Sequence, residues 1–435
     1  MNYEMNLSTL FLIFLITLIF IVVFFIFQKK QLDKITITFF SFSFFIYSGY
    51  GISNHLVSNW YISSYAIFLL AILLSYTFAK RPKKNKNQLE IAEDPISNFF
   101  EINKNFLYFL VFVYFICLFV PLFVPIIRIK DFFSPPISLI NDIFSKRDEL
   151  KDTPLLYLTQ NIKLMLTPFF LIYLKLLKDK SKYFLILFLS SLWIYLEFLK
   201  VNYISRNDMV GYAMLLFFIV FSSKGKEFFI RKKYFIILCI FFIVSIPFLI
   251  SYQYTRSGAT VGSNTGLLES VKSLLNYETY YPIYFQQIID KQISVSPIIY
   301  FLWLLFIIVP SQLVPMKPTI AINGIFTTAI TGLIPGQRYY SIILPSILGE
   351  AFMLYGNLFF WIHAIFLGTM LGKIQKYFEQ YPSLMYWNIF ILVQFIKITR
   401  GGSQGFISEI INGSILIFCL ILFLKNKINK ERKLI

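Results

Sequence analysis

The sequence is short of charged residues and of the residue types that build metal and redox sites. Only 14% of its 435 residues are charged, and it has three cysteines and two histidines. A soluble domain carries about 25% charged residues. Cys117, Cys239 and Cys419 all fall inside apolar runs, so no disulfide framework is predicted. No His, Cys and carboxylate cluster has metal-ligand spacing. These shortages argue against a soluble protein, a disulfide-rich domain and a metal enzyme.

The motifs of nucleotide chemistry are missing as well. No Walker loop and no glycine-rich dinucleotide loop appears, and no Asp-x-Asp pair marks a glycosyltransferase that uses nucleotide sugars. We therefore expect no cofactor. There is also no internal repeat of the kind that transporters use. The first apolar segment lacks a small-residue cleavage site, which indicates a retained span rather than a signal peptide.

Long apolar runs dominate the chain. Its mean hydropathy is +0.69 and 57% of its residues are apolar. Apolar runs of about 20 residues identify helices that cross a membrane. We predict an all-α polytopic membrane protein with 11–13 transmembrane helices, forming a single transmembrane domain over residues 1–435. The eleven better-supported spans are 7–27, 35–53, 60–79, 106–126, 161–176, 183–199, 209–222, 234–253, 351–371, 384–398 and 406–424.

The net charge of +18 is a topology signal rather than a sign of nucleic-acid binding. Most of the lysines and arginines lie in short loops between spans, and such loops face the cytoplasm. The longest basic loop carries Lys80, Arg81, Lys83, Lys84 and Lys86. With this loop inside, the spans alternate so that the N-terminus is outside and the basic tail is inside. We expect no nucleic-acid partner.

A stretch from Pro310 to Gly356 departs from the pattern of regular spans. It contains five prolines and five glycines together with three charged residues, Lys317, Arg338 and Glu350. Non-helical backbone at membrane depth is tolerated only where protein or a wet cavity satisfies it. We expect residues 254–350 to form an external and re-entrant region that carries much of the site. Residues 297–335 fit a re-entrant pair, and two full spans remain the alternative.

Isolated basic residues stand at the predicted outer ends of spans, against the usual charge bias. They are Arg206 in S-R-N-D, Arg256 in Y-T-R-S-G, Arg338 in G-Q-R-Y-Y and Arg400 in T-R-G-G, with Lys317 joining them in a re-entrant arrangement. Arginine suits bidentate binding of phosphate oxygens. The pattern predicts an external cationic cavity for a pyrophosphate-linked lipid. The alternative is contact with ordinary anionic headgroups or with nearby acidic side chains.

Other polar residues complete the candidate site. Glu350 follows a glycine at the outer end of a span, and is a candidate general base or a partner of an arginine. Asp208 beside Arg206 suggests a salt bridge, and we group it with Lys317, Arg338 and Tyr339 as candidate substrate contacts. We expect His363 to be a packed polar residue within a span, and His55 to lie in an external turn.

Four of these motifs resemble those of the Wzy-type polymerases, which join oligosaccharide repeat units into O-antigen or capsule. S-R-N-D-M-V-G at 205–211 is similar to the family's Ser-Arg turn, and P-S-Q-L-V-P-M-K-P at 310–318 to its proline- and lysine-containing element. L-G-E-A-F-M-L-Y-G at 348–356 resembles its Gly-Glu span start, and T-R-G-G at 399–402 its Arg-Gly turn. The chain departs from the family at Ser311, where arginine is common.

The resemblance implies a GT-C-like membrane glycosyltransferase in the bacterial inner membrane, with its site facing the exterior. Its donor would be a glycan on undecaprenyl pyrophosphate, and its acceptor one repeat unit on the same lipid. Arg206, Arg256 and Arg400 would then act in catalysis with Glu350, without a metal. Membrane lipids, a chain-length regulator and a flippase would be its partners.

Two alternatives share parts of this pattern. A flippase or other glycan transporter would also be polytopic with a cationic path, but it should carry charges within spans and on both faces. An O-antigen ligase would use the same lipid donor and the same arginines. We would expect a ligase to have a histidine in a large late external loop, and the late loops here have none.

Overall fold

The computed structural model describes a set of helical segments and, within these residues, no strand. The described residues are 7–50, 59–81, 94–123, 154–201, 215, 281–307, 322–334, 337 and 342–434. The helices are α1 (Leu7–Phe27), α2 (Gln31–Ser48), α3 (Asn59–Lys80), α4 (Pro95–Ile102), α5 (Lys104–Phe123), α8 (Pro154–Asp179), α9 (Tyr183–Val201), α13 (Tyr281–Asp290), α14 (Pro297–Leu305), α15 (Ile322–Thr331), α16 (Ser346–Phe359), α17 (Trp361–Phe378), η3 (Pro382–Leu384), α18 (Met385–Gly401) and α19 (Gln404–Leu434). The all-helical prediction is confirmed for this part of the chain.

Several described helices have the length and composition to cross a membrane. They are Thr9–Phe27, Asn59–Lys80 and Gln404–Lys427, and a fourth span arises if the bent pair Pro95–Ile102 and Lys104–Val120 is counted as one. By their length and composition, these helices indicate a membrane protein. The total of 11–13 spans stays a prediction, and the predicted spans 209–222 and 234–253 lie outside the described helices.

Contacts divide the chain into two compact units. The first takes its described residues from Met1–Asn87, Lys272–Phe378 and Gln394–Ser408, and the second from Gln88–Val271, Glu379–Val393 and Glu409–Ile435. Helices α18 and α19 therefore each contribute to both units. The predicted single transmembrane domain over the whole chain stays a prediction.

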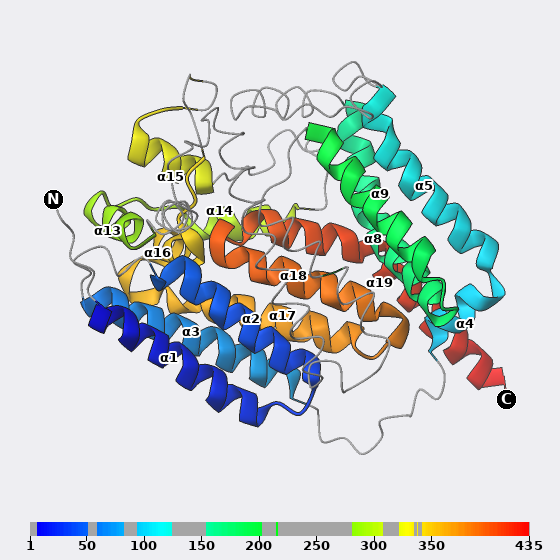
Figure 1. The fold of residues 1–435 in the computed structure, drawn as a ribbon, viewed down its shortest axis with the longest axis horizontal. Helices are drawn as coiled ribbons and strands as arrows, with labels where there is room; N and C mark the ends of the chain where they lie inside the picture. Colours follow the sequence, from blue (N-terminus) through cyan, green and yellow to red (C-terminus); the bar gives the residue numbers. More distant parts are fainter. Residues whose placement is uncertain are drawn as a thin grey trace, which may run out of the picture. The chain divides into compact units, whose positions relative to one another are not determined.

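The first unit is built on a bundle of α1, α2, α3 and α17 (Figure 1). The closest packing joins α3 to α17, where Gly368 and Gly372 face the neighbouring backbone. A Cβ atom at Gly372 would lie 2.7 Å from Ala79 Cβ and 2.8 Å from the carbonyl oxygen of Tyr76, and one at Gly368 would overlap Ser75 and Ile72. Small residues four apart allow two helix backbones to approach closely in a membrane. These glycines therefore set the spacing between α3 and α17.

Buried charges join the ends of three helices in the same unit. Asp33 of α2 pairs with Lys80 of α3, and both side chains are almost fully buried. The Tyr76 hydroxyl donates to the Asp33 carboxylate over 3.0 Å and lies 2.7 Å from Gln375 Oε1 of α17. A buried charge is stable only when it is paired and hydrogen-bonded. This cluster therefore ties α2, α3 and α17 together.

The predicted span 351–371 is not one continuous helix. Gly356 has φ +68° and ψ −172°, and α16 ends at Phe359 before α17 begins at Trp361. A positive φ is a conformation that glycine adopts readily and other residues rarely do. The glycine that closes the L-G-E-A-F-M-L-Y-G motif therefore interrupts the helix within this predicted span.

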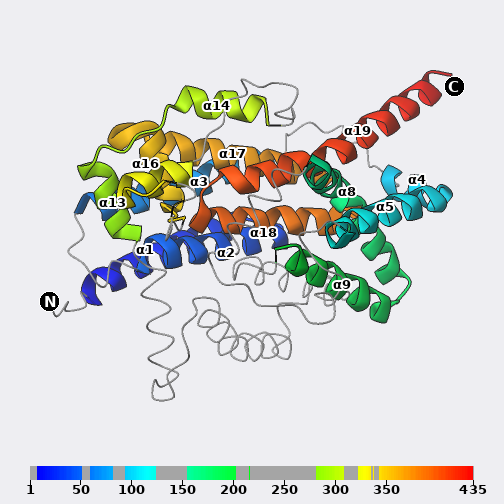
Figure 2. The ribbon, with the colours of Figure 1, turned by 90° about the horizontal axis from the view of Figure 1, so that it is seen from above.

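Two short helices lie in the region predicted to be re-entrant. Helix α14 has nine residues and α15 has ten. At about 1.5 Å per residue, neither is long enough by itself to cross a bilayer. Both helices belong to the first unit, where Figure 2 shows α14 along α17. Because residues 308–321 lie outside the described part, the re-entrant arrangement stays a prediction.

The second unit packs α5, α8 and α9 through aromatic side chains. The Phe170 ring of α8 stacks on Tyr114 of α5 at 4.9 Å and meets Trp193 of α9 edge-on at 5.6 Å. Asp94 caps α4 by accepting from the Ile96 amide, and it also accepts from the Ser383 amide at 2.6 Å. One carboxylate thus fixes both the start of α4 and the start of η3.

Candidate functional site

Glu350 lies in the second turn of α16, inside the first unit. Its side chain is 1% exposed. The glycine before it is required by close packing, because a Cβ atom at Gly349 would lie 3.0 Å from Ile288 of α13 and from Pro345. The L-G-E sequence therefore lets α16 approach α13 while it carries the carboxylate inward. Glu350 is consequently a buried acid with a fixed position.

Both oxygens of the Glu350 carboxylate accept hydrogen bonds from Ser403. The Ser403 backbone amide donates to Oε2 over 2.6 Å, and its hydroxyl donates to Oε1. Ser403 immediately precedes α19, so the carboxylate meets the positive end of that helix dipole. A carboxylate at this place stabilises the helix terminus and closes the turn between α18 and α19.

The α18–α19 turn needs glycine where it meets Glu350. Gly402 has φ +78°, and a Cβ atom there would overlap Glu350 Oε2. The Asn323 amide of α15 donates to the Gly401 carbonyl over 3.1 Å. The G-G-S sequence after Arg400 is therefore shaped to receive a carboxylate, and a third helix holds the turn from the other direction.

A polar chain extends from the carboxylate in two directions. The Tyr300 hydroxyl of α14 lies 2.6 Å from Ser403 Oγ. On the other side, His363 Nε2 of α17 lies 3.4 Å from Glu350 Oε1. Tyr300, Ser403 and His363 are each fully buried. Three helices, α14, α16 and α17, and the α18–α19 turn thus meet around one buried carboxylate.

Arg400 is the penultimate residue of α18 and lies three residues before Ser403. It is half-buried, and its guanidinium carbon lies 6.0 Å from the Tyr47 ring centre. The neighbouring Thr399 hydroxyl lies 2.6 Å from the Ser43 hydroxyl of α2. The end of α18 is therefore anchored to α2, which places the arginine at the same turn that Glu350 holds.

Of the residues predicted for the site, Glu350 and Arg400 are described, and the structure brings them to one turn. Arg206, Arg256, Lys317, Arg338, Tyr339 and Asp208 lie outside the described residues. Their places in the site stay predictions. The region 254–350 is described only over 281–307, 322–334, 337 and 342–350.

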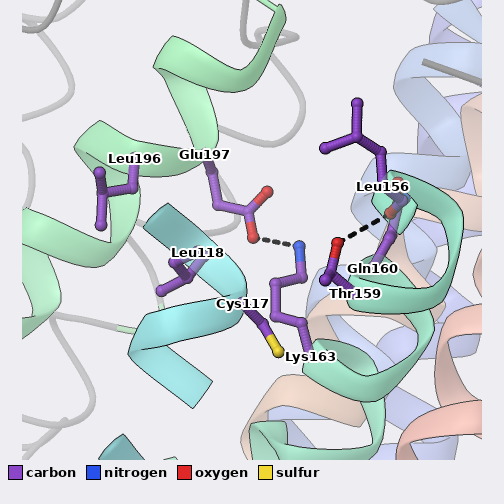
Figure 3. Close-up of a pocket in the computed structure, with 8 residues that line it drawn as sticks. All are labelled: Cys117, Leu118, Leu156, Thr159, Gln160, Lys163, Leu196 and Glu197. Carbon is purple, nitrogen blue, oxygen red and sulfur yellow. Dashed lines mark hydrogen bonds and ion pairs between the residues drawn. The ribbon is translucent and has the colours of Figure 1, made fainter. Parts of the chain in front are cut away.

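A second polar site lies in the other unit, where a small cavity opens between α5, α8 and α9. Lys163 of α8 and Glu197 of α9 point toward each other across it and form an ion pair (Figure 3). The Thr159 hydroxyl donates to the Leu156 carbonyl over 3.0 Å, so it is already engaged. Cys117 adds a thiol to the wall. The pair compensates two charges inside predicted spans.

Sequence reasoning missed the pairing of Lys163 with Glu197, although a signal was present. Opposite charges within two neighbouring predicted spans, 161–176 and 183–199, are expensive unless they pair. The contact of His363 with Glu350 was missed for another reason. The two residues lie on separate helices, and their distance depends on the break at Gly356.

Among the described residues, no group of three or more His, Cys, Asp or Glu side chains could hold a metal ion. Comparison of the chain with family models, with curated proteins and with solved structures finds no match. The resemblance to Wzy-type polymerases therefore rests on the sequence motifs alone.

Proposed function

We propose that the protein is a membrane glycosyltransferase that polymerises oligosaccharide repeat units carried on undecaprenyl pyrophosphate. It would act at the outer face of the bacterial inner membrane and build O-antigen or capsular polysaccharide. The non-reducing-end hydroxyl of one lipid-linked unit attacks the anomeric carbon of the donor glycan. The bond to the donor's pyrophosphate breaks, and the lipid pyrophosphate leaves.

One observation supports this proposal above the others. The Gly-Glu motif and the Arg-Gly motif meet through Glu350 and Ser403, which are 53 residues apart in the sequence. In the resemblance both motifs belong to the site. Their contact supports the proposal because two motifs that resembled the family only by chance would not be expected to meet at one turn.

The guanidinium of Arg400 is suited to stabilise the lipid pyrophosphate that leaves. A guanidinium can bind two phosphate oxygens at once, and fixed positive groups aimed at developing charge supply the largest part of most such catalysis. The Glu350 contact and the Ser43–Thr399 contact hold both sides of the arginine. We propose that Arg206 and Arg256 act with Arg400 on the pyrophosphate, with Lys317, Arg338, Tyr339 and Asp208 as substrate contacts.

Glu350 has two possible roles in this reaction, and the two roles require different behaviour of its hydrogen bonds to Ser403. As a general base it takes the proton of the acceptor hydroxyl, a contribution of about 10²–10⁴-fold in rate. For this, Ser403 has to release one of its two hydrogen bonds, because the carboxylate is 1% exposed. As a positioning residue it holds the Arg400 turn, and no release is needed.

The substitution Glu350→Gln separates these roles. The Gln side chain keeps the shape, since its carbonyl can accept from the Ser403 amide and its NH₂ can donate to the Ser403 hydroxyl. It cannot take a proton. Normal chain extension by this variant would rule out the general-base role and leave the positioning role standing.

The test of the function is gel analysis of surface and lipid-linked glycan in a deletion strain. The strain is complemented with wild type, Arg206→Ala, Arg256→Ala, Arg400→Ala or Glu350→Gln. Lys180→Ala is the matched control, because it removes an exposed positive charge at a predicted cytoplasmic turn. We expect single repeat units on the surface in the deletion strain and in the four site variants, and full chains with the control.

Other outcomes identify other functions. Loss of even single surface units on deletion indicates an export or earlier step, as expected for a flippase, and contradicts the proposal. Long chains that accumulate on the lipid carrier without transfer to core lipid indicate a ligase. If the deletion leaves single units but the point variants made at normal levels extend chains, the function stands and the proposed site is wrong.

A further inference from the structure

His363 is a buried imidazole whose surroundings leave it unsatisfied if it is neutral. It is 0% exposed. The rings of Tyr300, Tyr355 and Phe366 surround it at centre distances of 5.7, 5.9 and 6.4 Å. Among the described residues, neither ring nitrogen has a hydrogen-bond partner. In a neutral ring whose hydrogen is on Nε2, that nitrogen faces Glu350, but Nδ1 is a buried acceptor that meets no described donor, which is unfavourable.

The hydrogen bonds of the neighbouring Glu350 carboxylate favour a negative charge. Both oxygens of Glu350 accept hydrogen bonds from Ser403, which is the pattern of an ionised acid. Because the Ser403 hydroxyl donates to Glu350, the Tyr300 hydroxyl at 2.6 Å must be the donor to Ser403. The two Ser403 donors therefore reach the carboxylate, and the Tyr300 hydroxyl supports one of them, an arrangement that favours the negative charge.

A buried negative charge requires a positive partner. His363 Nε2 lies 3.4 Å from Glu350 Oε1, a distance that suits an ion pair. Among the described residues, Tyr300 from α14 and Tyr355 from α16 are titratable groups that interact with Glu350, and an ordinary tyrosine hydroxyl is neutral at neutral pH. Neither tyrosine can supply a positive charge to the carboxylate, whereas His363 can.

We propose that His363 is protonated in the folded protein and forms a buried ion pair with Glu350. In this arrangement His363 is a positioning residue: it keeps Glu350 ionised, and the ionised carboxylate holds the turn that carries Arg400. The charge state stands on the contacts described above. Its importance for glycan polymerisation rests on the proposed function.

The charge state can be measured directly, because the chain has two histidines. In a His55→Gln background, His363 gives the sole histidine signal of a full-length protein labelled with nitrogen-15 histidine. The imidazole nitrogen chemical shifts distinguish the charged ring from the neutral one. We expect the charged form at neutral pH in lipid nanodiscs, and the neutral form when Glu350→Gln is added.

A second variant keeps the proposal falsifiable if Glu350→Gln does not fold. Ser403→Ala removes a donor to the carboxylate but leaves the carboxylate itself, so His363 should remain charged. A neutral His363 in the parent protein at neutral pH overturns the ion pair. An identical histidine spectrum in the parent and in a folded Glu350→Gln variant overturns it as well.

The importance of the His363–Glu350 pair for glycan polymerisation is tested separately in the complemented deletion strain. His363→Gln removes the charge and should leave single repeat units, whereas His363→Lys restores a positive charge and should recover at least part of the chain extension. Full extension by His363→Gln would show that the pair has no role in the reaction. Failure of the proposed function would appear separately, as a deletion strain without the single-unit phenotype.

Discussion

At the scale of single residues, Gly402 shows most directly how the backbone is shaped for Glu350. Its positive φ and the space that Glu350 Oε2 occupies both exclude a side chain. The same carboxylate then reaches the Ser403 amide and hydroxyl. Glycine at this position is therefore a requirement of the contact rather than a sign of a flexible loop.

Replacing Gly402 with alanine should disturb the contact with Glu350. The positive φ alone costs about 1–3 kcal/mol for a residue with a side chain, and the added methyl group would displace the carboxylate. We expect a lower unfolding temperature in detergent and loss of chain extension. Gly405→Ala is the control, since a Cβ atom there meets nothing within 4 Å. Equal behaviour of the two variants would contradict the close contact.

The buried ion pair of Asp33 and Lys80 supports a second prediction at this scale. Asp33→Ala leaves a buried ammonium without its acid, and breaking such a pair costs about 3–5 kcal/mol. The exposed pair of Lys175 and Asp179 is the matched control, because surface pairs contribute about 0–1 kcal/mol. Thermal unfolding in detergent should therefore separate Asp33→Ala clearly from Lys175→Ala. Similar midpoints would mean that Asp33 contributes little to stability.

At the scale of elements, close helix packing decides the structure of the first unit. Helices α3 and α17 approach each other at Gly368 and Gly372, where any side chain would meet the partner's backbone. The short helices α14 and α15 lie near the start of α16 and supply Tyr300 and Asn323 to the α18–α19 turn. Broken and short helices thus position the polar groups, while the long helices form the frame.

Enlarging Gly368 should separate α3 from α17. Gly368→Leu places a branched side chain against Ile72 and Ser75, and such overpacking costs about 1–3 kcal/mol or more. We expect a lower unfolding temperature and less protein in the membrane. Ile365→Phe enlarges a residue of α17 that is 42% exposed, and it should change neither property. Equal loss in both variants would argue against a specific role of the glycine.

At the scale of the whole molecule, the distribution of basic residues predicts an orientation that the contacts do not test. The N-terminus is expected outside and the tail inside. Alkaline phosphatase fused after Ile435 should be inactive, because it folds only outside the cytoplasm, whereas the same enzyme fused after Ser263 should be active. Green fluorescent protein at both positions gives the opposite pattern and checks expression. An active phosphatase after Ile435 would require a different number of spans.

The sequence by itself determined the helical class and most of the helix positions. The predicted spans 7–27, 60–79 and 384–398 correspond to α1, α3 and α18 within a few residues. This works because the bilayer demands internally satisfied backbone and a fixed length of apolar chain, and both are visible along the sequence. The same logic selected Glu350 and Arg400, since charges among apolar residues are costly.

Only the tertiary structure decided which side chains meet. Three features depend on how helix faces pack: the break at Gly356, the contact of Glu350 with Ser403 and the approach of His363 to the carboxylate. Each of them would change if a helix shifted by less than the size of a side chain. Hydropathy reports the environment of a segment but not its neighbours. The close approach of separate helices, which small residues such as Gly349 and Gly402 permit, therefore had to be observed in three dimensions.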